Sequence, residues 1–328
     1  MRNAAITGAT GFLGAHLLRG FEARGARVLA VVHTMDGRSP AGARPLEDGS
    51  RLFAGIDVVV HAAAAPYTHE VHAEAYRIAN ADLLARTMRA CADAGVPRFV
   101  LVSSAAVYGF PARLPVTEEC PFGPRTLYAA AKVEAEMRAR RLARELGLSV
   151  VIARPSLVYG PGDRRGVFQK MAAMIRAGVY RVVGSGNNVL HHMHVDDLVE
   201  GLWLAATHPN AEDDDFLLAG PETITLAELS DLVAQSVGRT LPARHVPSVL
   251  ARAVATVVDI AAHQGLVFAP RDHPVNHERL DMMTLPISYD IAKARARLQF
   301  APRVGYREGV MRTLCGEWPA LAQAGAGT

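Results

Sequence analysis

Cysteine is scarce in this chain of 328 residues, which contains only three. Cys91, Cys120 and Cys315 lie far apart in the sequence, and none belongs to a pair with metal-ligand spacing. Small secreted domains that are stapled by disulfides carry an even and denser set of cysteines. The cysteine content therefore argues against a disulfide framework and predicts reduced thiols, as in the cytosol.

An excess of charge of one sign is also missing. The chain has 35 basic and 32 acidic residues, a net charge of +3 and a pI of about 8.9. These charges are spread along the sequence, with no basic run of the kind that follows a nucleic-acid backbone. We therefore expect a small-molecule substrate and no nucleic-acid partner.

Long hydrophobic runs are absent as well. The longest apolar stretch of the C-terminal half, Val249 to Ala262, contains Arg252 and Asp259, whereas a helix that spans a bilayer needs about 20 apolar residues. We expect an amphipathic helix and no integral membrane segment, with contact at a membrane surface as the other open interpretation. Because a strand and a glycine turn begin directly after Met1, we also expect no export signal and a cytoplasmic location.

The first 160 residues alternate short β-branched runs with longer alanine-rich segments. The expected strands are Ala4–Thr7, Val28–Val32, Asp57–His61, Phe99–Ser103 and Val150–Arg154. The expected helices are Leu13–Ala23, Ala73–Ala94 and Tyr128–Leu146. Strands that alternate with crossover helices of this length form a parallel sheet with helices on both faces. The sequence therefore predicts an α/β fold with a doubly wound parallel sheet.

Beyond Pro155, glycine and proline become denser, and an acidic run from Asp213 to Asp215 follows. We expect a cofactor-binding core over residues 1–160. Residues 161–319 are expected to form mainly a smaller substrate-binding cap, with the chain returning to the core, and residues 320–328 a disordered tail. The aspartate run is expected to be a solvated loop.

The segment TGATGFLG follows a short apolar strand and opens a helix. In a dinucleotide-binding turn, one glycine permits the tight turn, the next lets the backbone approach the pyrophosphate, and the third allows close helix-strand packing. The helix N-terminus adds a favourable dipole. This context favours a cofactor site over a glycine turn that binds nothing. The contacts expected here are Gly8, Thr10, Gly11, Phe12, Leu13 and Gly14.

The residue after the second strand indicates which nicotinamide cofactor binds. NAD sites usually place Asp or Glu there, to hold the ribose hydroxyls. Here His33 takes that place, and Arg38 follows where it would meet a 2′-phosphate, although Asp36 between them leaves NAD open. The sequence predicts NAD(P), with NADP slightly favoured. Further contacts are expected from Glu47, Asp48, Ala62, Ala63, Ala64, Val102, Ser103, Tyr128, Lys132 and Pro155.

A Tyr-x-x-x-Lys pair, Tyr128 and Lys132, begins the third of these helices. Residues four apart share a helical face, and a nearby ammonium favours the phenolate that a tyrosine base needs near neutrality. The strand FVLVSSAAVYG ends in Ser104, which we expect at the same sheet edge, hydrogen-bonded to the substrate oxygen. Its alternative role is to cap its own backbone. A second such pair, Tyr289 and Lys293, lacks a strand-borne serine upstream and is expected to start a surface helix.

Taken together and in order, TGATGFLG, DVVVHAAA, VSSAAVYG, YAAAK, RPSLVYGPGD and HVDDLVEG resemble the extended short-chain dehydrogenase/reductase superfamily over nearly the whole chain. The resemblance implies a Rossmann core, a C-terminal substrate domain, and Ser104, Tyr128 and Lys132 as the catalytic triad. It also implies Asn80 as a polar residue near the nicotinamide. A homodimer built from the helices around Ala73–Ala94 and Tyr128–Leu146 is implied too.

Within that superfamily, sugar-nucleotide epimerases and dehydratases usually carry an Asn and an Arg that serve substrate phosphates. This sequence has Leu157 and Leu190 at those places, and Ala105 and Ala106 where dehydratases carry an acidic pair. Its C-terminal segments are more similar to the branch of 3β-hydroxysteroid and sterol dehydrogenases. The expected substrate contacts are Ser104, Ala105, Tyr108, Ser156, Leu157, Leu190 and His192.

Three histidines with an aspartate, His191, His192, His194 and Asp196, resemble a metal cluster only by count, because strand alternation puts just His192 and His194 on one face. We expect no metal, and one histidine facing the substrate.

The sequence as a whole predicts a reversible NAD(P)-dependent alcohol dehydrogenase or ketoreductase. The expected substrate is an apolar hydroxyl or keto compound of steroid or polyketide type. The alternative is an epimerase of sugar nucleotides that keeps its NAD, and a cofactor sensor without chemistry is disfavoured by the complete triad.

Overall fold

The computed structural model describes residues 1–33, 39–64, 81–164, 166–242, 245–263, 280–281 and 284–316. Its central feature is a seven-stranded sheet in the order β10-β6-β5-β4-β1-β2-β3, in which every neighbouring pair is parallel. The strands are β1 (Asn3–Thr7), β2 (Arg27–Val32), β3 (Arg44–Pro45), β4 (Val58–His61), β5 (Arg98–Val102), β6 (Ser149–Pro155) and β10 (Asp215–Leu218). The strand order reverses between β1 and β4, which in such sheets is where a ligand binds, at the carboxyl edge.

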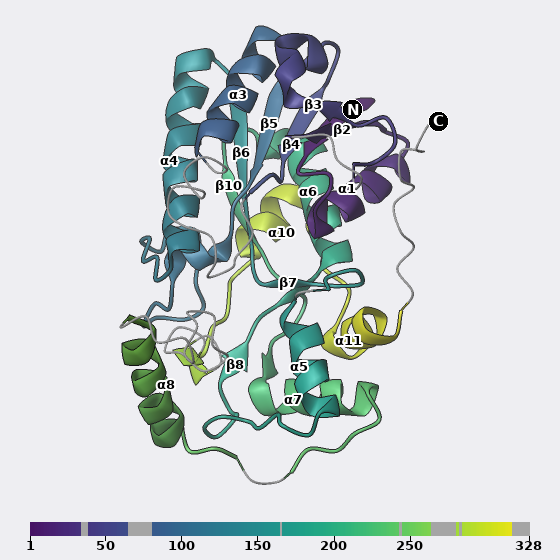
Figure 1. Cartoon of the computed structure of the whole chain (residues 1–328). Helices are drawn as coiled ribbons and strands as arrows, with labels where there is room; N and C mark the ends of the chain where they lie inside the picture. The colour runs from purple at the N-terminus through teal and green to yellow at the C-terminus, as the bar shows by residue number, and fades with distance from the viewer. Residues whose placement is uncertain are drawn as a thin grey trace.

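Helices cover both faces of the sheet because the central strands carry apolar side chains toward both faces. In β4, Val58 and Val60 belong to the core under α1 (Phe12–Glu22) and α6 (Val195–Thr207), while Val59 belongs to the core under α3 (Leu83–Asp93) and α4 (Leu127–Leu146). Figure 1 shows α3 and α4 side by side on one side of the sheet and α1 with α6 on the other. The α/β fold with a doubly wound parallel sheet is therefore confirmed.

The ends of α4 are fixed by local sequence, and this positions the Tyr-x-x-x-Lys pair. Thr126 caps the N-terminus, accepting a hydrogen bond from the backbone N–H of Ala129 at 3.0 Å. Gly147 ends the helix in the left-handed conformation, with φ of +64°, which glycine adopts without steric cost. Tyr128 and Lys132 consequently occupy the first turns of a helix with both ends defined.

A second lobe lies below the sheet in Figure 1. Its helices α5 (Val167–Arg176), α7 (Leu226–Ser236) and α11 (Tyr306–Cys315) share one core that contains Phe168, Leu229 and Val310. Two short pairs join it to the sheet region: β7 (Val158–Tyr159) with β9 (Met193–His194), and β8 (Val189–Leu190) with β11 (Ile224–Thr225). The remaining elements are α8 (Ser248–His263), α10 (Ala292–Leu298), η1 (Leu46–Phe53), η3 (Ala105–Tyr108) and η4 (Pro209–Ala211).

The five expected strands are confirmed to within two residues at each end. The sequence interpretation missed β3 and β10, which are short edge strands of the same sheet. The first part of the expected helix from Ala73 and the expected tail at 320–328 lie outside the described residues. The limits at 160 and 319 stay predictions. In the described part of the chain, no helix has the length and apolar character needed to cross a membrane.

The acidic run is a solvated loop only at its start, where Asp213 is exposed in a turn; the other two aspartates differ from that expectation. Asp215 opens β10 and forms ion pairs with Arg154 and Arg140, and Asp214 pairs with Lys293 at 2.6 Å. Asp213 accepts a hydrogen bond from the backbone N–H of Val150 at 3.0 Å. The run fastens the last strand to its neighbours because each carboxylate meets a donor from another element.

The second Tyr-x-x-x-Lys pair also differs from its expectation. Tyr289 pairs with Val116 in a β-bridge before α10 begins, and its ring packs against two of the core clusters. The ammonium of Lys293 lies 5.4 Å from the ring of Phe216. Tyr289 is therefore part of the interior rather than the start of a surface helix.

Candidate active site

A cavity of about 520 Å³ lies at the carboxyl edge of the sheet, where the second lobe meets it. Ser104, Tyr128 and Lys132 all line this cavity. They come from the end of β5 and from α4, which the parallel topology brings to the same edge. The three residues that the sequence pattern singled out are thus brought together around one space.

Lys132 is almost fully buried, at 5% exposed, although lysines rarely are. Its ammonium donates a hydrogen bond to the carbonyl oxygen of Val102 at 2.9 Å and lies 5.8 Å from the centroid of the Tyr128 ring. Burial lowers the pKa of Lys132 to about 8, and the negative charge of Glu136 acts in the opposite direction. Below that pH the lysine holds a positive charge beside the tyrosine.

Ser104 combines both roles considered for it. Its Oγ accepts a hydrogen bond from the backbone N–H of Ala106 at 3.2 Å and so caps η3, while the side chain also lines the cavity. Because Oγ serves as acceptor there, its own proton remains able to reach an oxygen in the cavity. The neighbouring Ser103 differs, since its Oγ donates to Glu136 at 2.5 Å.

The glycine turn fits a dinucleotide. Gly8 has φ of +74°, and a Cβ there would lie 2.7 Å from the backbone nitrogen of Ala63, while a Cβ on Gly14 would lie 2.2 Å from the carbonyl oxygen of Gly8. Gly11 is the N-cap of α1 and supplies no side-chain hydrogen bond to it. The first backbone N–H groups of α1 are consequently left for a ligand, which is the arrangement that binds phosphate.

Several of the expected cofactor residues line the same cavity: Phe12, Leu13, Ala62, Ala64, Val102, Ser103 and Pro155. His33 is exposed directly after β2, and Glu47 and Asp48 lie in η1, which follows the β3 strand paired with β2. Thr10 is exposed in the turn. Arg38 and Asn80 lie outside the described residues.

Of the expected substrate contacts, Ala105, Ser156, Leu157, Leu190 and His192 line the cavity, together with Ser104. Tyr108 does not, which corrects that expectation. It belongs to the short helix η3, and its hydroxyl accepts a hydrogen bond from Arg154 at 2.7 Å beneath the cavity wall. The helical turn after Ser104 directs this ring inward.

Sequence reasoning missed cavity residues from distant segments, namely Phe110, Arg125, Asp163, Ile287 and Tyr289. Ile287 donates its backbone N–H to Val189 at 2.8 Å, and Tyr289 donates its own to Nδ1 of His191 at 3.1 Å. The contact between Tyr289 and His191 joins residues 98 positions apart in the sequence. No local pattern marks such residues.

The histidine segment is not a regular strand, because β8 ends at Leu190 and β9 begins at Met193. Two histidines, His191 and His192, therefore line the cavity, where one was expected. His191 is held between the Tyr289 N–H and the carbonyl oxygen of Gly220 at 3.0 Å. Burial lowers the pKa of His192 to about 3. Among the described residues, no group of three or more metal-ligand side chains occurs.

A buried ion network lies next to the candidate triad. Arg154 is 2% exposed, and its guanidinium binds Glu136, Asp215 and the hydroxyl of Tyr108. Glu136 follows Lys132 by one turn of α4. The sequence shows the charges but gives no sign that they meet, since they come from four separate elements.

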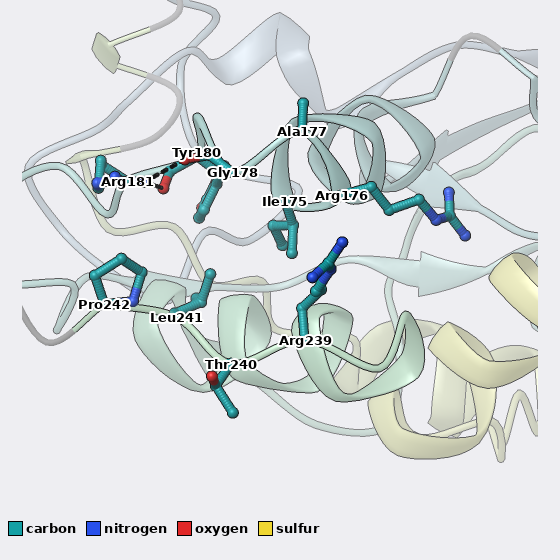
Figure 2. A pocket seen from close by; sticks show the side chains of 10 residues that line it. All are labelled: Ile175, Arg176, Ala177, Gly178, Tyr180, Arg181, Arg239, Thr240, Leu241 and Pro242. Atoms are coloured by element: carbon teal, nitrogen blue, oxygen red, sulfur yellow. Dashed lines mark hydrogen bonds between the residues drawn. The ribbon is translucent and has the colours of Figure 1, made fainter.

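A second pocket of about 340 Å³ lies in the other lobe, after α5 and α7. Figure 2 shows Arg176, Arg181 and Arg239 spread along it rather than pointing to one spot. Arg181 donates to the carbonyl oxygens of Gly178 and Tyr180 at 2.9 and 2.7 Å. None of its lining residues belongs to the triad.

Comparison with known proteins identifies a family. The family described as "NAD dependent epimerase/dehydratase family" matches residues 4–219. The 4-hydroxy-2-methyl-3-oxo-4-farnesyl-3,4-dihydroquinoline-1-oxide ketoreductase of Stigmatella aurantiaca is 30% identical, over 98% of this chain and 96% of that protein. The dTDP-4-dehydro-6-deoxy-D-allose reductase of Streptomyces bikiniensis is 32% identical over 73% of this chain and 82% of that protein.

Two further similarities are more distant. The 3beta-hydroxysteroid-dehydrogenase/decarboxylase isoform 1 of Arabidopsis thaliana is 26% identical over 80% of this chain, which spans 62% of that protein. Among solved structures, the UDP-glucuronic acid 4-epimerase from Bacillus cereus in complex with NAD superposes with a TM-score of 0.75. It is 19% identical and the match covers 96% of this chain and 98% of that one. At that identity the structural match shows a common fold.

Proposed function

The chain belongs to the NAD-dependent epimerase/dehydratase family, and on that premise we propose that it is a nicotinamide-dependent alcohol dehydrogenase or ketoreductase. Its proposed substrate is an apolar hydroxyl or keto compound, such as a steroid- or polyketide-like molecule. The observation that carries this proposal is the composition of the part of the cavity wall that lies outside the triad. Leu157 and Leu190 line that wall, at the places where sugar-nucleotide enzymes of the superfamily usually carry phosphate-binding residues.

The proposed chemistry assigns one task to each member of the triad. A bound nicotinamide supplies or accepts the hydride at the substrate carbon. Tyr128 gives or takes the proton at the substrate oxygen, and the ammonium of Lys132 favours its phenolate. Ser104 donates a hydrogen bond to the same oxygen, which its bond from the Ala106 N–H leaves it able to do. Each of these groups lines one cavity, within reach of a common substrate.

The apolar wall sets the substrate class. Leu157, Leu190 and Ile287 make this part of the lining apolar, while the charged Arg125 and Asp163 line the cavity from other segments. A nucleoside diphosphate carries two negative phosphates, which bind best to arginine forks or backbone N–H groups. Burying them against leucine would leave their charge without partners. The name of one relative, a ketoreductase, includes a compound with an apolar farnesyl group, and this supports an apolar substrate.

The second candidate is conversion of a sugar nucleotide. It is favoured by one observation, the 32% identity to a reductase whose name gives a dTDP-sugar substrate. In its epimerase form it predicts NAD that stays bound through purification and is not consumed.

One assay distinguishes the two candidates. Purified enzyme is given NADH or NADPH with steroid and polyketide-like ketones, while UDP- and dTDP-sugars are incubated separately and analysed by chromatography. We expect cofactor oxidation with an apolar ketone. Conversion of a sugar nucleotide, with no turnover of any apolar ketone, would replace the proposal by the second candidate.

For the cofactor, we propose a slight preference for NADP over NAD. The support is His33, exposed after β2, where a carboxylate would repel a 2′-phosphate. Replacing this residue, as in His33→Asp, is expected to lower kcat/KM with NADPH several-fold more than with NADH. An unchanged ratio would show that His33 does not contribute to cofactor choice.

We also propose a homodimer that works in the cytoplasm. The described cysteines are free thiols, and α4 exposes Leu127 and Met137, at 59% and 64%. Large apolar side chains on a helix surface favour contact with a second copy. Light scattering after size exclusion, with Met137→Glu as the disrupting variant, tests the assembly.

A further inference from the structure

Glu136 is a carboxylate with no exposed surface, located one helical turn beyond the catalytic lysine. Tyr128, Lys132, Glu136 and Arg140 recur every four residues along α4 and so form a single polar stripe facing the sheet. Carboxylates are buried in this way only when hydrogen-bonded and paired. The partners of Glu136 therefore indicate what it holds in place.

The first partner lies at the end of β5. Ser103 donates its hydroxyl to Glu136 at 2.5 Å, and the preceding residue Val102 accepts a hydrogen bond from Lys132 at 2.9 Å. Two successive turns of α4 are thus tied to two successive residues of the strand. The next residue in the chain is Ser104, so these two bonds determine where the catalytic serine stands relative to Tyr128.

The second partner lies on β6. Arg154 donates to Glu136 from Nε at 3.0 Å and from Nη2 at 2.7 Å, and it also pairs with Asp215 of β10. Pro155 and Ser156, the residues that follow Arg154, line the cavity. A single carboxylate consequently connects α4, β5 and β6, and residues at or just after each of these elements line the cavity.

The carboxylate of Glu136 also affects the charge state of Lys132. Burial lowers the pKa of Lys132 to about 8, and Glu136 is the group that opposes this shift. Of the other titratable groups, His61 on β4 interacts with Lys132, and burial lowers its pKa to about 3, so it is neutral; Arg154 pairs with Glu136 itself. Tyr128 on α4 is the group whose proton moves. Without the charge of Glu136, nothing would oppose the effect of burial on the ammonium of Lys132.

Stability alone gives a weak reason for such a network. Buried ion pairs are often replaceable by apolar residues of similar volume without loss of stability, because desolvation offsets their attraction. A network that binds Ser103, next to Ser104, and lies one helical turn from Lys132 points to geometry and charge at the site instead.

We infer that Glu136 is a positioning residue of the catalytic site, which acts through Ser103 and Lys132. It holds the end of β5 against α4 and places a negative charge one turn from the buried ammonium. The inference rests on the proposed function for its kinetic consequence, but its electrostatic consequence is measurable without any substrate.

The chain contains only three lysines, Lys132, Lys170 and Lys293, so lysine-selective isotope labelling gives three side-chain signals in NMR. Lys132 is assigned by substituting the other two with arginine. In Glu136→Gln, we expect the titration of Lys132 to move down by about one pH unit or more, a tenfold change in proton affinity. An unchanged titration in folded Glu136→Gln would overturn the electrostatic part of the inference.

Two matched variants separate the effect of the Glu136 charge from that of its hydrogen bond to Ser103, which is called the tether below. Glu136→Asp keeps the charge but is too short to hold Ser103, and Ser103→Ala removes the tether while leaving the charge. Both are expected to keep the Lys132 titration and to lower kcat several-fold with little change in KM. If Glu136→Gln does not fold, loss of the parental Lys132 titration in Glu136→Asp contradicts the inference. Unchanged kcat in Ser103→Ala contradicts the tether.

These readouts also distinguish failure of the inference from failure of the proposed function. If no apolar ketone is turned over, the titration of Lys132 in the holoprotein still decides the electrostatic part. The kinetic part is then measured with whichever substrate the enzyme accepts.

Discussion

The two walls of the central cavity differ in origin and in chemistry. The wall formed by α4 and the end of β5 presents Ser104, Tyr128 and Lys132, all within one stretch of the N-terminal core. The second wall is the apolar part of the lining, Leu157, Leu190 and Ile287, from segments that come together only in the folded chain. The first wall carries groups that can donate or accept protons, and the second carries apolar side chains.

The difference indicates that reaction and recognition are specified separately in this protein. The polar wall is supported from behind by ion pairs and hydrogen bonds, with Arg154 and Glu136 at its centre. The apolar wall is supported by packing, in which Leu190 shares a core with Phe168 and Leu229. Changes on one wall should therefore alter the chemical step, and changes on the other should alter the choice of substrate.

The largest effect is expected for Tyr128→Phe. Removing the hydroxyl removes the proton donor and acceptor, so kcat is expected to fall by about 100- to 10,000-fold, the usual contribution of general acid-base catalysis. The fall in kcat is measured from the absorbance of the reduced cofactor, by stopped-flow or steady-state kinetics. The matched control is Tyr180→Phe, whose hydroxyl bonds Ser230 in the other lobe. If the Tyr128→Phe enzyme kept the turnover of the parent, the chemical step could not be assigned to the polar wall.

A smaller effect, on the apolar wall, is expected for Leu157→Asn. A polar amide facing an apolar substrate is expected to lower kcat/KM for that substrate about tenfold, in line with pocket substitutions of this size. Val179→Asn, at a position 63% exposed in the other lobe, is the control. If Leu157→Asn raised activity toward an apolar ketone, the assignment of this wall to an apolar substrate would have to be abandoned.

The polar wall should also affect the pH dependence of kcat on the alkaline side. Lys132 has its pKa lowered by burial to about 8, so it is charged below that pH and loses its charge above it. We expect kcat to fall as pH rises through about 8. In Lys132→Arg the side chain stays charged at every accessible pH, so this alkaline fall should disappear even though overall activity drops. Persistence of the same fall in Lys132→Arg would assign it to another group.

Low pH should reduce the stability of the fold through His192, which also lines the cavity. Burial lowers the pKa of His192 in the folded chain to about 3, from an ordinary value of 6.5. The unfolded chain takes up the proton first, so the stability that the neutral ring contributes is present above 6.5 and is lost as pH falls toward 3. The loss is about 1.4 kcal/mol per pH unit within that window. Denaturant unfolding of His192→Gln between pH 7 and 5 should show a shallower decline.

The control for that experiment is the exposed His245, as His245→Gln, which should retain the parental decline. An equal slope in parent and His192→Gln would mean that other groups, such as His61 with a pKa of about 3, account for the acid sensitivity.

The polar wall could be read from the sequence because its residues obey local rules. Tyr128 and Lys132 need only helical spacing to share a face, and Gly8, Gly11 and Gly14 need only a strand before them and a helix after them. The α/β class followed from the alternation of apolar strands and helices. Tyr108 was wrongly assigned because η3 turned its ring under the wall, a rotation that the spacing after Ser104 did not reveal.

The sequence by itself thus determined the sheet, the glycine turn and the pairing of Tyr128 with Lys132, since backbone periodicity dictates which side chains lie together over a few turns. Only the tertiary structure decided that Ile287 and Tyr289 complete the cavity, that Asp215 meets Arg154, and that Glu136 lies behind Lys132 against Ser103. Those contacts join residues far apart along the chain. Their pairing depends on the strand order and on the exclusion of water from buried charge, which neither spacing nor composition records.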